Sequence, residues 1–416
     1  MERTMTMRRF RWLGSLLATV VLAATPMQTM ADSVVMYDEG SGIPLQELLA
    51  EDAAVWPVMA APSGDGLSVK AKGAVLMDQA SGRVLFEQDP YAQVPIASVT
   101  KVMTLLLVME AIDDGRLAWE EAVVCSDRAA SMGGSQIWLE PGEIMTVEEL
   151  VKAAAVVSAN DACTALAEHI SGTLEAFVAA MNARVAELGL RNTRFVDCSG
   201  LDDTGYSCAY DVAVMSRELM RHKRICDFTT IWMDTLRGGA SQLVNTNKLV
   251  RHYKGATGLK TGTTGAAGYC LAATAQREDT AFVAVVLGSP TTNDRFDGAR
   301  ALLDHAFAAY ESYTPDAKSL AVPPIPVLKG QAPTVAVQTD APATVLLAKG
   351  QKARVESSME VAQDLQAPVE KGQVVGTWRL TVDGETVGEY PLRTACAVPA
   401  KTFRYAYTLL ADALLG

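Results

Sequence analysis

Three short motifs in this sequence combine residue types that nucleophilic catalysis needs, and each motif occurs once. They are, in chain order, Ser98-Val99-Thr100-Lys101, Ser158-Ala159-Asn160 and Lys260-Thr261-Gly262. Each motif alone is equally consistent with a helix cap, a turn or a surface hairpin, because such short patterns arise easily by chance. All three in this order indicate a nucleophilic serine that is served by a lysine base.

The spacing of the first motif explains how Ser98 and Lys101 would act together. Residues three apart lie on one face of a helix, so the amine of Lys101 can reach the hydroxyl of Ser98. A serine hydroxyl needs a base to take its proton, and a lysine is a base only when it is neutral. The apolar residues that follow, as far as Ile112, predict a buried helix, and burial lowers the pKa of a lysine. A second cation nearby, Lys260, would lower this pKa further.

The second motif supplies another hydroxyl and an amide. Ser158 can pass a proton between Lys101 and a leaving amine. Asn160 can hold both the lysine and a substrate through hydrogen bonds, because its amide group donates as well as accepts.

The third motif suits the anionic end of a substrate. Lys260 and Thr261 supply a charge and a hydroxyl donor, and Thr263 continues the same backbone edge beyond Gly262. At the first motif, the helix N-terminus places Ser98 where backbone N–H groups favour developing negative charge.

Histidines and cysteines give no indication of a metal site or of a histidine-based triad. The histidines are His169, His222, His252 and His305. None has metal-ligand spacing, and no G-x-S-x-G sequence is present. The seven cysteines show no CxxC pattern; Cys198 and Cys208 could close a disulfide loop, while most of the thiols are expected to be buried in the core. We therefore expect neither a metal nor a cofactor.

The pattern of apolar residues predicts the elements that position these motifs. Two hairpins are expected, one from residues 72–78 and 83–88 and the other from residues 268–274 and 280–287. Helices are expected from Ser98, from Thr146 to about Val157 with Glu149 completing a capping box, and over residues 160–171, 173–188 and 295–313. Hairpins separated by long helical blocks favour an antiparallel sheet covered by helices, with a small β-rich part after the prolines at 323–326.

Composition and charge exclude some classes of function. The 416 residues carry 36 basic and 48 acidic side chains, a net charge of −12. A basic stretch, an apolar stretch and a small-residue cleavage site follow one another at the N-terminus, and this order predicts a secretory signal over residues 1–31. This segment holds four arginines and one glutamate, so its removal takes away a charge of +3 and leaves −15. A chain this acidic is a poor candidate for binding nucleic acid.

The sequence from about Gly73 to Tyr313 resembles the D-alanyl-D-alanine carboxypeptidases, which are low-molecular-mass penicillin-binding serine peptidases. The resemblance extends beyond the motifs to GSQIWLEPGEIMTVEELVKAAAVVSANDACTALAEHISG and to SQLVNTNKLV. It implies an α/β (α+β) fold of the penicillin-binding and serine β-lactamase type, in which helices and a helical subdomain flank an antiparallel sheet. The domains expected are an irregular leader (residues 32–66), a catalytic domain (67–317), a C-terminal β domain (318–398) and an amphipathic membrane-anchor helix (399–416).

The resemblance also implies a role for each motif residue. Ser98 would be the acylated nucleophile and Lys101 its base, with Ser158 as proton relay beside Asn160. The substrate would be bound by Lys260, Thr261, Gly262, Thr263 and Arg295. The amides of Ser98 and Thr263 would form the oxyanion hole.

The function implied is removal of the terminal D-alanine from peptidoglycan stem peptides that end in D-Ala-D-Ala, with β-lactam antibiotics as inhibitors. The protein would be exported and act at the outer face of the cytoplasmic membrane, in the periplasm or the cell-wall space. One alternative is a serine β-lactamase, although no convincing glutamate for deacylation stands between the second and third motifs. Another is a catalytically silent wall-binding scaffold, for which five intact catalytic residues would be unnecessary. Transfer of the acyl group to a second strand instead of water stays open.

Overall fold

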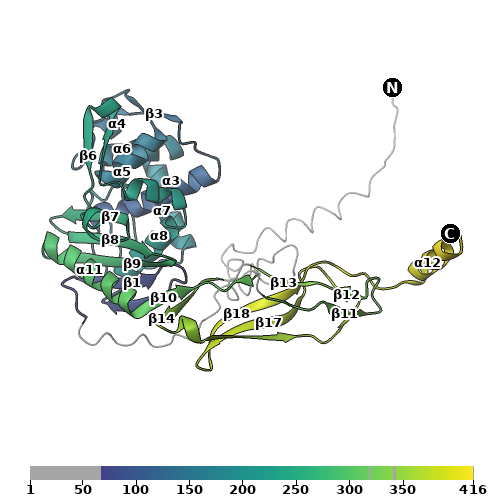
Figure 1. Ribbon diagram of the computed structural model, residues 1–416. Helices are drawn as coiled ribbons and strands as arrows, with labels where there is room; N and C mark the ends of the chain where they lie inside the picture. The colour runs from purple at the N-terminus through teal and green to yellow at the C-terminus, as the bar shows by residue number, and fades with distance from the viewer. Residues whose placement is uncertain (1–66, 318–319, 341–342, 416) are drawn as a thin grey trace, which may run out of the picture. The chain divides into compact units, whose positions relative to one another are not determined.

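The computed structural model describes residues 67–317, 320–340 and 343–415 (Figure 1). The expected signal peptide (1–31) and the irregular leader (32–66) lie outside the described residues. The expected domain boundaries at 317 and 398 stay predictions.

A five-stranded antiparallel sheet forms the centre of the catalytic part. Its order is β2-β1-β9-β8-β7, so both predicted hairpins belong to it and β7 is an edge strand. The strands are β1 (Gly73–Asp78), β2 (Val84–Gln88), β7 (Ala256–Thr264), β8 (Gly268–Arg277) and β9 (Thr280–Ser289). In β9 the odd-numbered residues from Val283 to Leu287 enter one core and the even-numbered residues from Phe282 to Val286 enter another. Both faces of the sheet are therefore covered, which explains why β9 is apolar along its whole length.

Helices cover these two faces. Helix α11 (Thr292–Ala309) packs on β8 and β9, and helix α8 (Ala209–Leu219) packs on β1 and β9 from the other side (Figure 1). The other helices of this part are α3 (Lys101–Asp113), α4 (Asp127–Ala130), α5 (Val147–Val156), α6 (Asn160–Ser171), α7 (Leu174–Glu187), α9 (Cys226–Thr229) and α10 (Leu249–His252), with the 3-10 turns η1 (Ala97–Thr100), η2 (Lys223–Ile225) and η3 (Arg237–Gly239). The capping box predicted at Thr146 and Glu149 is present at the start of α5.

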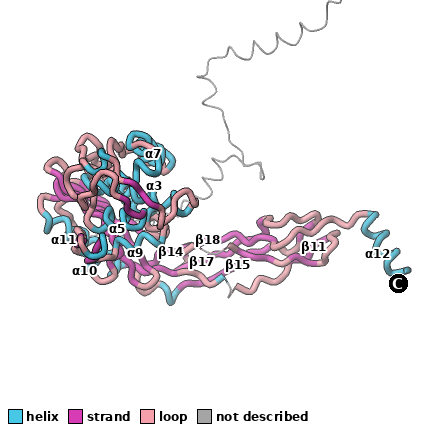
Figure 2. The backbone as a smooth tube through the Cα atoms, turned by 90° about the horizontal axis from the view of Figure 1, so that it is seen from above, coloured by secondary structure: helices cyan, strands magenta, loops and turns pink. Residues whose placement is uncertain are grey.

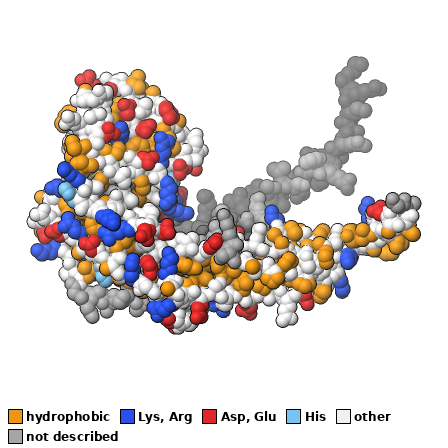
Figure 3. Space-filling model, viewed as in Figure 1, with side chains coloured by type: hydrophobic (Ala, Val, Ile, Leu, Met, Phe, Trp, Pro, Cys, Tyr) orange, Lys and Arg blue, Asp and Glu red, His pale blue; other side chains and the backbone are white. Residues whose placement is uncertain are grey.

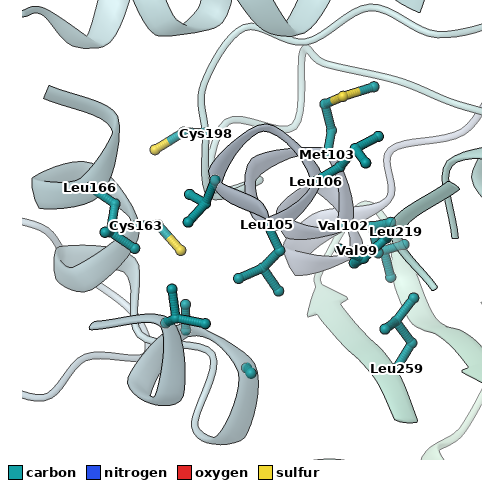
Figure 4. Close-up of a cluster of buried hydrophobic side chains, with 14 of the residues drawn as sticks. Val99, Val102, Met103, Leu105, Leu106, Cys163, Leu166, Cys198, Leu219 and Leu259 are labelled. Atoms are coloured by element: carbon teal, nitrogen blue, oxygen red, sulfur yellow. The ribbon is translucent and has the colours of Figure 1, made fainter. Parts of the chain in front are cut away.

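Helix α3 runs through the larger core and is buried on most of its circumference. Val102 lies on the side that contains Leu219 of α8 and Leu259 of β7, whereas Leu105 points toward α6, where Leu166 lies (Figure 4). The helix therefore contacts α6, α8 and β7. This packing explains the nearly continuous apolar sequence after Ser98 and confirms the prediction of a buried helix.

Two short hairpins extend the helical region. They are β3 (Ala122–Val124) with β4 (Ile144–Thr146), and β5 (Met233–Leu236) with β6 (Ser241–Val244). The sequence pattern did not predict them, because runs this short have too few residues to show an alternation.

One predicted helix is too long. Residues 295–313 were expected to be helical, but α11 ends at Ala309 and residues 310–313 form strand β10. This strand pairs antiparallel with β14 (Val345–Ala348), and its side chains alternate between buried and half-buried. The pairing partner lies more than thirty residues further along the chain, so the local pattern around Tyr310 gave no sign of it.

The remainder of the chain is β-rich, as predicted (Figure 2). A three-stranded sheet has the order β12-β11-β16 and a four-stranded sheet the order β13-β18-β17-β15. The elements are β11 (Ile325–Leu328), β12 (Thr334–Val335), β13 (Val337–Thr339), η5 (Lys352–Arg354), β15 (Val355–Val361), β16 (Leu365–Gln366), β17 (Val374–Val382), β18 (Glu385–Thr394) and the terminal helix α12 (Phe403–Leu415). Clusters of buried side chains around Val327 and around Trp378 form its core.

The cysteines are thiols in this structure. All seven are free, five are buried, and no disulfide joins Cys198 to Cys208. Burial raises the pKa of the Cys163 thiol to about 11, so this thiol stays protonated at neutral pH. The expectation that most cysteines are core residues is confirmed.

Candidate active site

The nucleophile candidate lies at the start of the buried helix. Ser98 is in the turn η1, which leads directly into α3, and it is half-buried while Ala97, Val99 and Thr100 around it are buried. Ala97 adopts a positive φ of 48°, a conformation that costs a non-glycine residue free energy and recurs at functional sites. The turn therefore leaves Ser98 as its only side chain that is not fully buried.

Lys101 is held by three oxygen atoms. Its Nζ lies 2.9 Å from Ser98 Oγ, 2.6 Å from Asn160 Oδ1 and 2.7 Å from the carbonyl oxygen of Ser199. The side chain is fully buried, and burial lowers the pKa of Lys101. A neutral amine has two N–H groups, which can donate hydrogen bonds to the amide oxygen of Asn160 and the carbonyl oxygen of Ser199. Its lone pair then faces the hydroxyl of Ser98, which is the arrangement that a base needs.

Asn160 owes its orientation to the loop opposite. Its Nδ2 donates to the carbonyl oxygen of Gly133 at 2.7 Å, and its backbone N–H donates to Ser135 at 2.7 Å. The amide oxygen is thereby left facing Lys101. The next residue, Asp161, is fully buried and accepts the N–H groups of Ile137 and Leu139, so it holds the same loop in place.

Ser158 is placed differently from the other motif residues. It adopts a positive φ of 65° between α5 and α6, and its hydroxyl is buried without a hydrogen-bond partner among the described residues. A buried hydroxyl without a partner is costly, so a hydrogen bond to Ser158 would be favourable.

The third motif lies on the free edge of β7. Gly262 is required there, because a Cβ atom at this position would lie 2.6 Å from the carbonyl oxygen of Ile96 and 3.0 Å from the backbone nitrogen of Ser98. The strand and the turn η1 thus approach so closely that only glycine fits. This approach brings Thr263, the next residue of the strand, to the neighbourhood of Ser98.

Lys260 is a second buried lysine. Its Nζ donates to the carbonyl oxygen of Thr261 at 3.0 Å, and no carboxylate pairs with it in the described part of the chain. Burial, followed by the positive charge of Lys101, holds the pKa of Lys260 well below its usual value. The expectation that burial lowers the pKa of Lys101 is confirmed, and burial is the largest cause at both lysines. The further lowering expected from a neighbouring lysine is found at Lys260, where Lys101 is the second cause.

Arg295 contacts strand β7 at the third motif. It comes from the first turn of α11 and is buried, with Nη1 3.1 Å from the carbonyl oxygen of Gly262 and 3.0 Å from Thr263 Oγ1. Within the described residues it forms no ion pair, and its Nε is buried without a partner. Burial lowers the pKa of Arg295. An unpaired buried cation beside the third motif favours the binding of an anion there.

Several residues of the site were not predicted from the sequence. Ser199 supplies a backbone carbonyl to Lys101, and Gly200 lies so close to η1 that a Cβ atom would fall 1.8 Å from the carbonyl oxygen of Ala97. Asp197 accepts the backbone N–H groups of Ser199 and Gly200. The signal that could have identified this loop is the Asp-x-x-Gly spacing from 197 to 200, which is typical of a turn closed by an aspartate.

Comparison with known proteins places the chain among related sequences and structures. The profile of the family described as D-alanyl-D-alanine carboxypeptidase matches residues 58–291, and that of penicillin-binding protein 5, C-terminal domain, matches residues 310–400. D-alanyl-D-alanine carboxypeptidase DacF of Bacillus subtilis is 42% identical over 331 residues, which cover 78% of this chain and 85% of that protein.

Solved structures agree with the sequence relatives. Penicillin binding protein 5 from Haemophilus influenzae gives a TM-score of 0.70 at 30% identity and covers 80% of this chain and 98% of its own. A penicillin-binding protein of Listeria monocytogenes, solved in the ampicillin-bound form, gives a TM-score of 0.53 at 32% identity, over 58% of this chain and 99% of its own. The fold predicted from the sequence, an antiparallel sheet flanked by helices with a β-rich part after it, is confirmed.

Proposed function

The chain belongs to the D-alanyl-D-alanine carboxypeptidase family, and from this premise we propose that Ser98 is the residue through which it removes the terminal D-alanine from peptidoglycan stem peptides. The observation that carries this assignment is the position of Lys101. A fully buried lysine amine lies 2.9 Å from the hydroxyl of Ser98 and is held by two fixed oxygen acceptors. A lysine placed in this way has no partner charge to neutralise and serves as a base.

The first half of the reaction acylates Ser98. The Oγ atom attacks the carbonyl carbon between the two D-alanines while Lys101 takes its proton. The oxygen of that carbonyl becomes an oxyanion, which accepts hydrogen bonds from the backbone N–H groups of Ser98 and Thr263. The bond to the leaving D-alanine then breaks, and its amine receives the proton of Lys101 through the hydroxyl of Ser158. The hydroxyl of Ser158 is buried and has no hydrogen-bond partner among the described residues, so it is free to bond to Lys101 and to the leaving amine during this step.

The second half hydrolyses the ester. Water attacks the carbonyl carbon of the acylated Ser98, and Lys101 again takes the proton. When the tetrahedral intermediate collapses, the proton returns to Ser98 Oγ and the shortened peptide leaves. Every step uses side chains and backbone groups of this chain, with neither a metal nor a cofactor taking part.

The third motif binds the free carboxylate of the terminal D-alanine. Burial favours the neutral form of Lys260, but a carboxylate that binds beside it favours the charged form. In the complex Lys260 and Arg295 therefore provide positive charge in a water-poor region, and the hydroxyl of Thr261 provides a directed donor. Gly262 lets the strand approach the nucleophile, and Asn160 holds both Lys101 and the substrate backbone. A β-lactam presents a carboxylate and a strained amide in a similar arrangement, so it acylates the same serine. The ampicillin-bound Listeria relative supports this extension.

The location that fits this substrate is outside the cytoplasm. The predicted signal over residues 1–31 supports export. Among the described residues no helix is both long and apolar enough to cross a membrane. Helix α12 exposes Phe403, Tyr407, Leu410 and Leu414 to solvent, and Figure 3 shows hydrophobic side chains on the surface of the C-terminal helix. We propose that this face inserts into the interfacial region of the outer leaflet of the cytoplasmic membrane and anchors the protein peripherally.

The test is D-alanine release from Nα,Nε-diacetyl-L-Lys-D-Ala-D-Ala by the chain from residue 32 onward. We expect the protein to release D-alanine and the Ser98→Ala variant to be slower by at least about a thousandfold. The variant should keep the fold, because Ser98 is half-buried at a turn. A Ser98→Ala variant with near-normal release would contradict the assignment of the nucleophile.

A further inference from the structure

The segment Asn245-Thr246-Asn247 lies against the third motif, and the reaction as described above makes no use of it. We propose that Thr246 is a positioning residue for the known reaction: its hydroxyl orients the hydroxyl of Thr261 toward the carboxylate of the substrate. This inference rests on the proposed function, because it assigns Thr261 to the carboxylate of the terminal D-alanine.

The two hydroxyl groups are in direct contact. Thr246 Oγ1 lies 2.7 Å from Thr261 Oγ1. Each hydroxyl has one proton to donate and can accept as well. When an anion binds next to Thr261, the proton of Thr261 must point to the anion, so the oxygen of Thr261 is left to accept the proton of Thr246. The pair then forms a chain of two hydrogen bonds that run in one direction and end on the carboxylate.

The chain of bonds is stronger than a single bond. A hydroxyl that already accepts a hydrogen bond is a better donor, and a bond to an ionised acceptor is stronger than one between neutral groups. Thr261 is buried and Thr246 is half-buried beside it. Water therefore competes less for these bonds than it would at an open surface.

The backbone around Thr246 is fixed from both sides. Asn245 is buried and donates from Nδ2 to the carbonyl oxygen of Ile231 at 2.7 Å. Its Oδ1 accepts the backbone N–H of Asn247 at 2.8 Å, and the side chain of Asn247 in turn accepts the N–H of Leu249. These bonds leave the hydroxyl of Thr246 with a defined position, so its bond to Thr261 has little orientational freedom to lose on binding.

Thr246 also connects the second and third motifs. Its backbone N–H donates to the carbonyl oxygen of Val156 at 3.1 Å. Val156 is the last residue of α5 and stands two positions before Ser158. The same residue thus joins the end of α5, which leads into the second motif, to the strand that carries the third motif.

The experiment compares two substrates that differ only in charge at the C-terminus. They are diacetyl-L-Lys-D-Ala-D-Ala and its C-terminal amide. Thr246→Val keeps the shape of the side chain and removes the hydroxyl, whereas Thr246→Ser keeps the hydroxyl. We expect Thr246→Val to lower kcat/KM for the carboxylate substrate by about three- to tenfold, the effect of one such hydrogen bond. The amide substrate should lose less than about twofold, and Thr246→Ser should stay close to the unchanged protein on both.

A matched control comes from the same strand. Thr257 of β7 forms another threonine pair, with its Oγ1 2.8 Å from Thr274 Oγ1, and it is also half-buried. Thr257→Val removes an equivalent bond away from the motif, so it should leave the ratio of the two substrates unchanged. Thermal unfolding of all variants separates a loss of stability from a change in that ratio.

Two results would overturn the inference while leaving the proposed function intact. One is an equal loss by Thr246→Val on the carboxylate and amide substrates. The other is a Thr246→Ser variant that behaves like Thr246→Val. If the unchanged protein released no D-alanine from the carboxylate substrate, the proposed function itself would fail, and the inference would fall with it.

Discussion

Lys101 is the residue whose surroundings decide the chemistry. A long, charged side chain is rarely buried completely, yet Lys101 is fully buried and has no acidic partner in direct contact among the described residues. Its neighbours are a hydroxyl, an amide oxygen and a backbone carbonyl. Such a site favours the neutral amine, because the charged form would lose its hydration without gaining a counter-ion.

The lowered pKa of Lys101 predicts the pH dependence of acylation. Only the neutral amine accepts the proton of Ser98, and the neutral fraction increases as the pH rises through the pKa of Lys101. The second-order rate constant for acylation by benzylpenicillin should therefore increase with pH and then level off, as stopped-flow measurements with a reporter β-lactam would show. Because burial lowers this pKa, the plateau should begin below the usual lysine value of about 10.4.

A variant separates this effect from titration elsewhere in the protein. Lys101→Met keeps most of the apolar contacts and removes the amine, so it should acylate about a hundred to ten thousand times more slowly. Its residual rate should not follow the same pH curve. A flat profile in the unchanged protein, or near-normal acylation by Lys101→Met, would show that another group is the base.

At the scale of elements, the site is a junction between a turn and a strand edge. The turn η1 and strand β7 approach until a side chain no longer fits between them. Helix α3 anchors the turn through its burial, and β8 anchors the strand through their antiparallel pairing. The nucleophile and the third motif are thus held at a fixed distance by two rigid elements, which is the condition for an oriented reaction.

Gly262→Ala tests this junction. The added Cβ would meet the backbone of Ile96 and Ser98 at 2.6 and 3.0 Å, so β7 and η1 must move apart. We expect acylation by benzylpenicillin to fall about a hundredfold, because a displacement on the order of 1 Å has this effect on catalysis. Gly265→Ala is the control: it lies three residues further on, and a Cβ atom there would meet nothing within 4 Å. Equal rates for the two variants would mean that the close approach is unimportant.

The elements that could be predicted from the sequence are those whose key residues lie close together along the chain. Ser98 and Lys101 are three residues apart, and both hairpins of the sheet have alternating or continuous apolar strands joined by short turns. Contacts between distant residues were not predictable in the same way. The carbonyl of Ser199 reaches Lys101 only through the fold, and every residue has a carbonyl, so no residue type marks it. Strand β10 was missed for the same reason, because its partner β14 lies far along the chain.

At the scale of the whole molecule, the acidic chain carries one terminal element with an exposed apolar face. Residues 401–416 contain Lys401, Arg404 and Asp412 as their only charged residues, so electrostatic attraction to lipid is weak. The contact that we propose must be mainly hydrophobic. The four apolar side chains of α12 named above are from about three-fifths to nearly nine-tenths exposed, and they recur at helical spacing on one face.

Substitutions in α12 test the membrane contact. Leu410→Glu combined with Leu414→Glu places two charges on the apolar face, whereas Thr408→Glu places a charge on another side of the same helix. The double variant should lose at least about tenfold in co-sedimentation with phosphatidylcholine vesicles, because burial of one leucine side chain is worth about 1.5–3 kcal/mol. Thr408→Glu should bind nearly as well as the unchanged protein. Equal binding by all three proteins would exclude α12 as the anchor.

The role of Ser98 as nucleophile is tested most directly by the mass of the protein after reaction with benzylpenicillin, measured on the intact protein and then on its proteolytic peptides. We expect one penicilloyl group per chain, located on the peptide that contains Ser98, and no adduct on the Ser98→Ala variant. An adduct on a different residue, or an unmodified protein whose fold is intact, would contradict the assignment of Ser98 as the nucleophile.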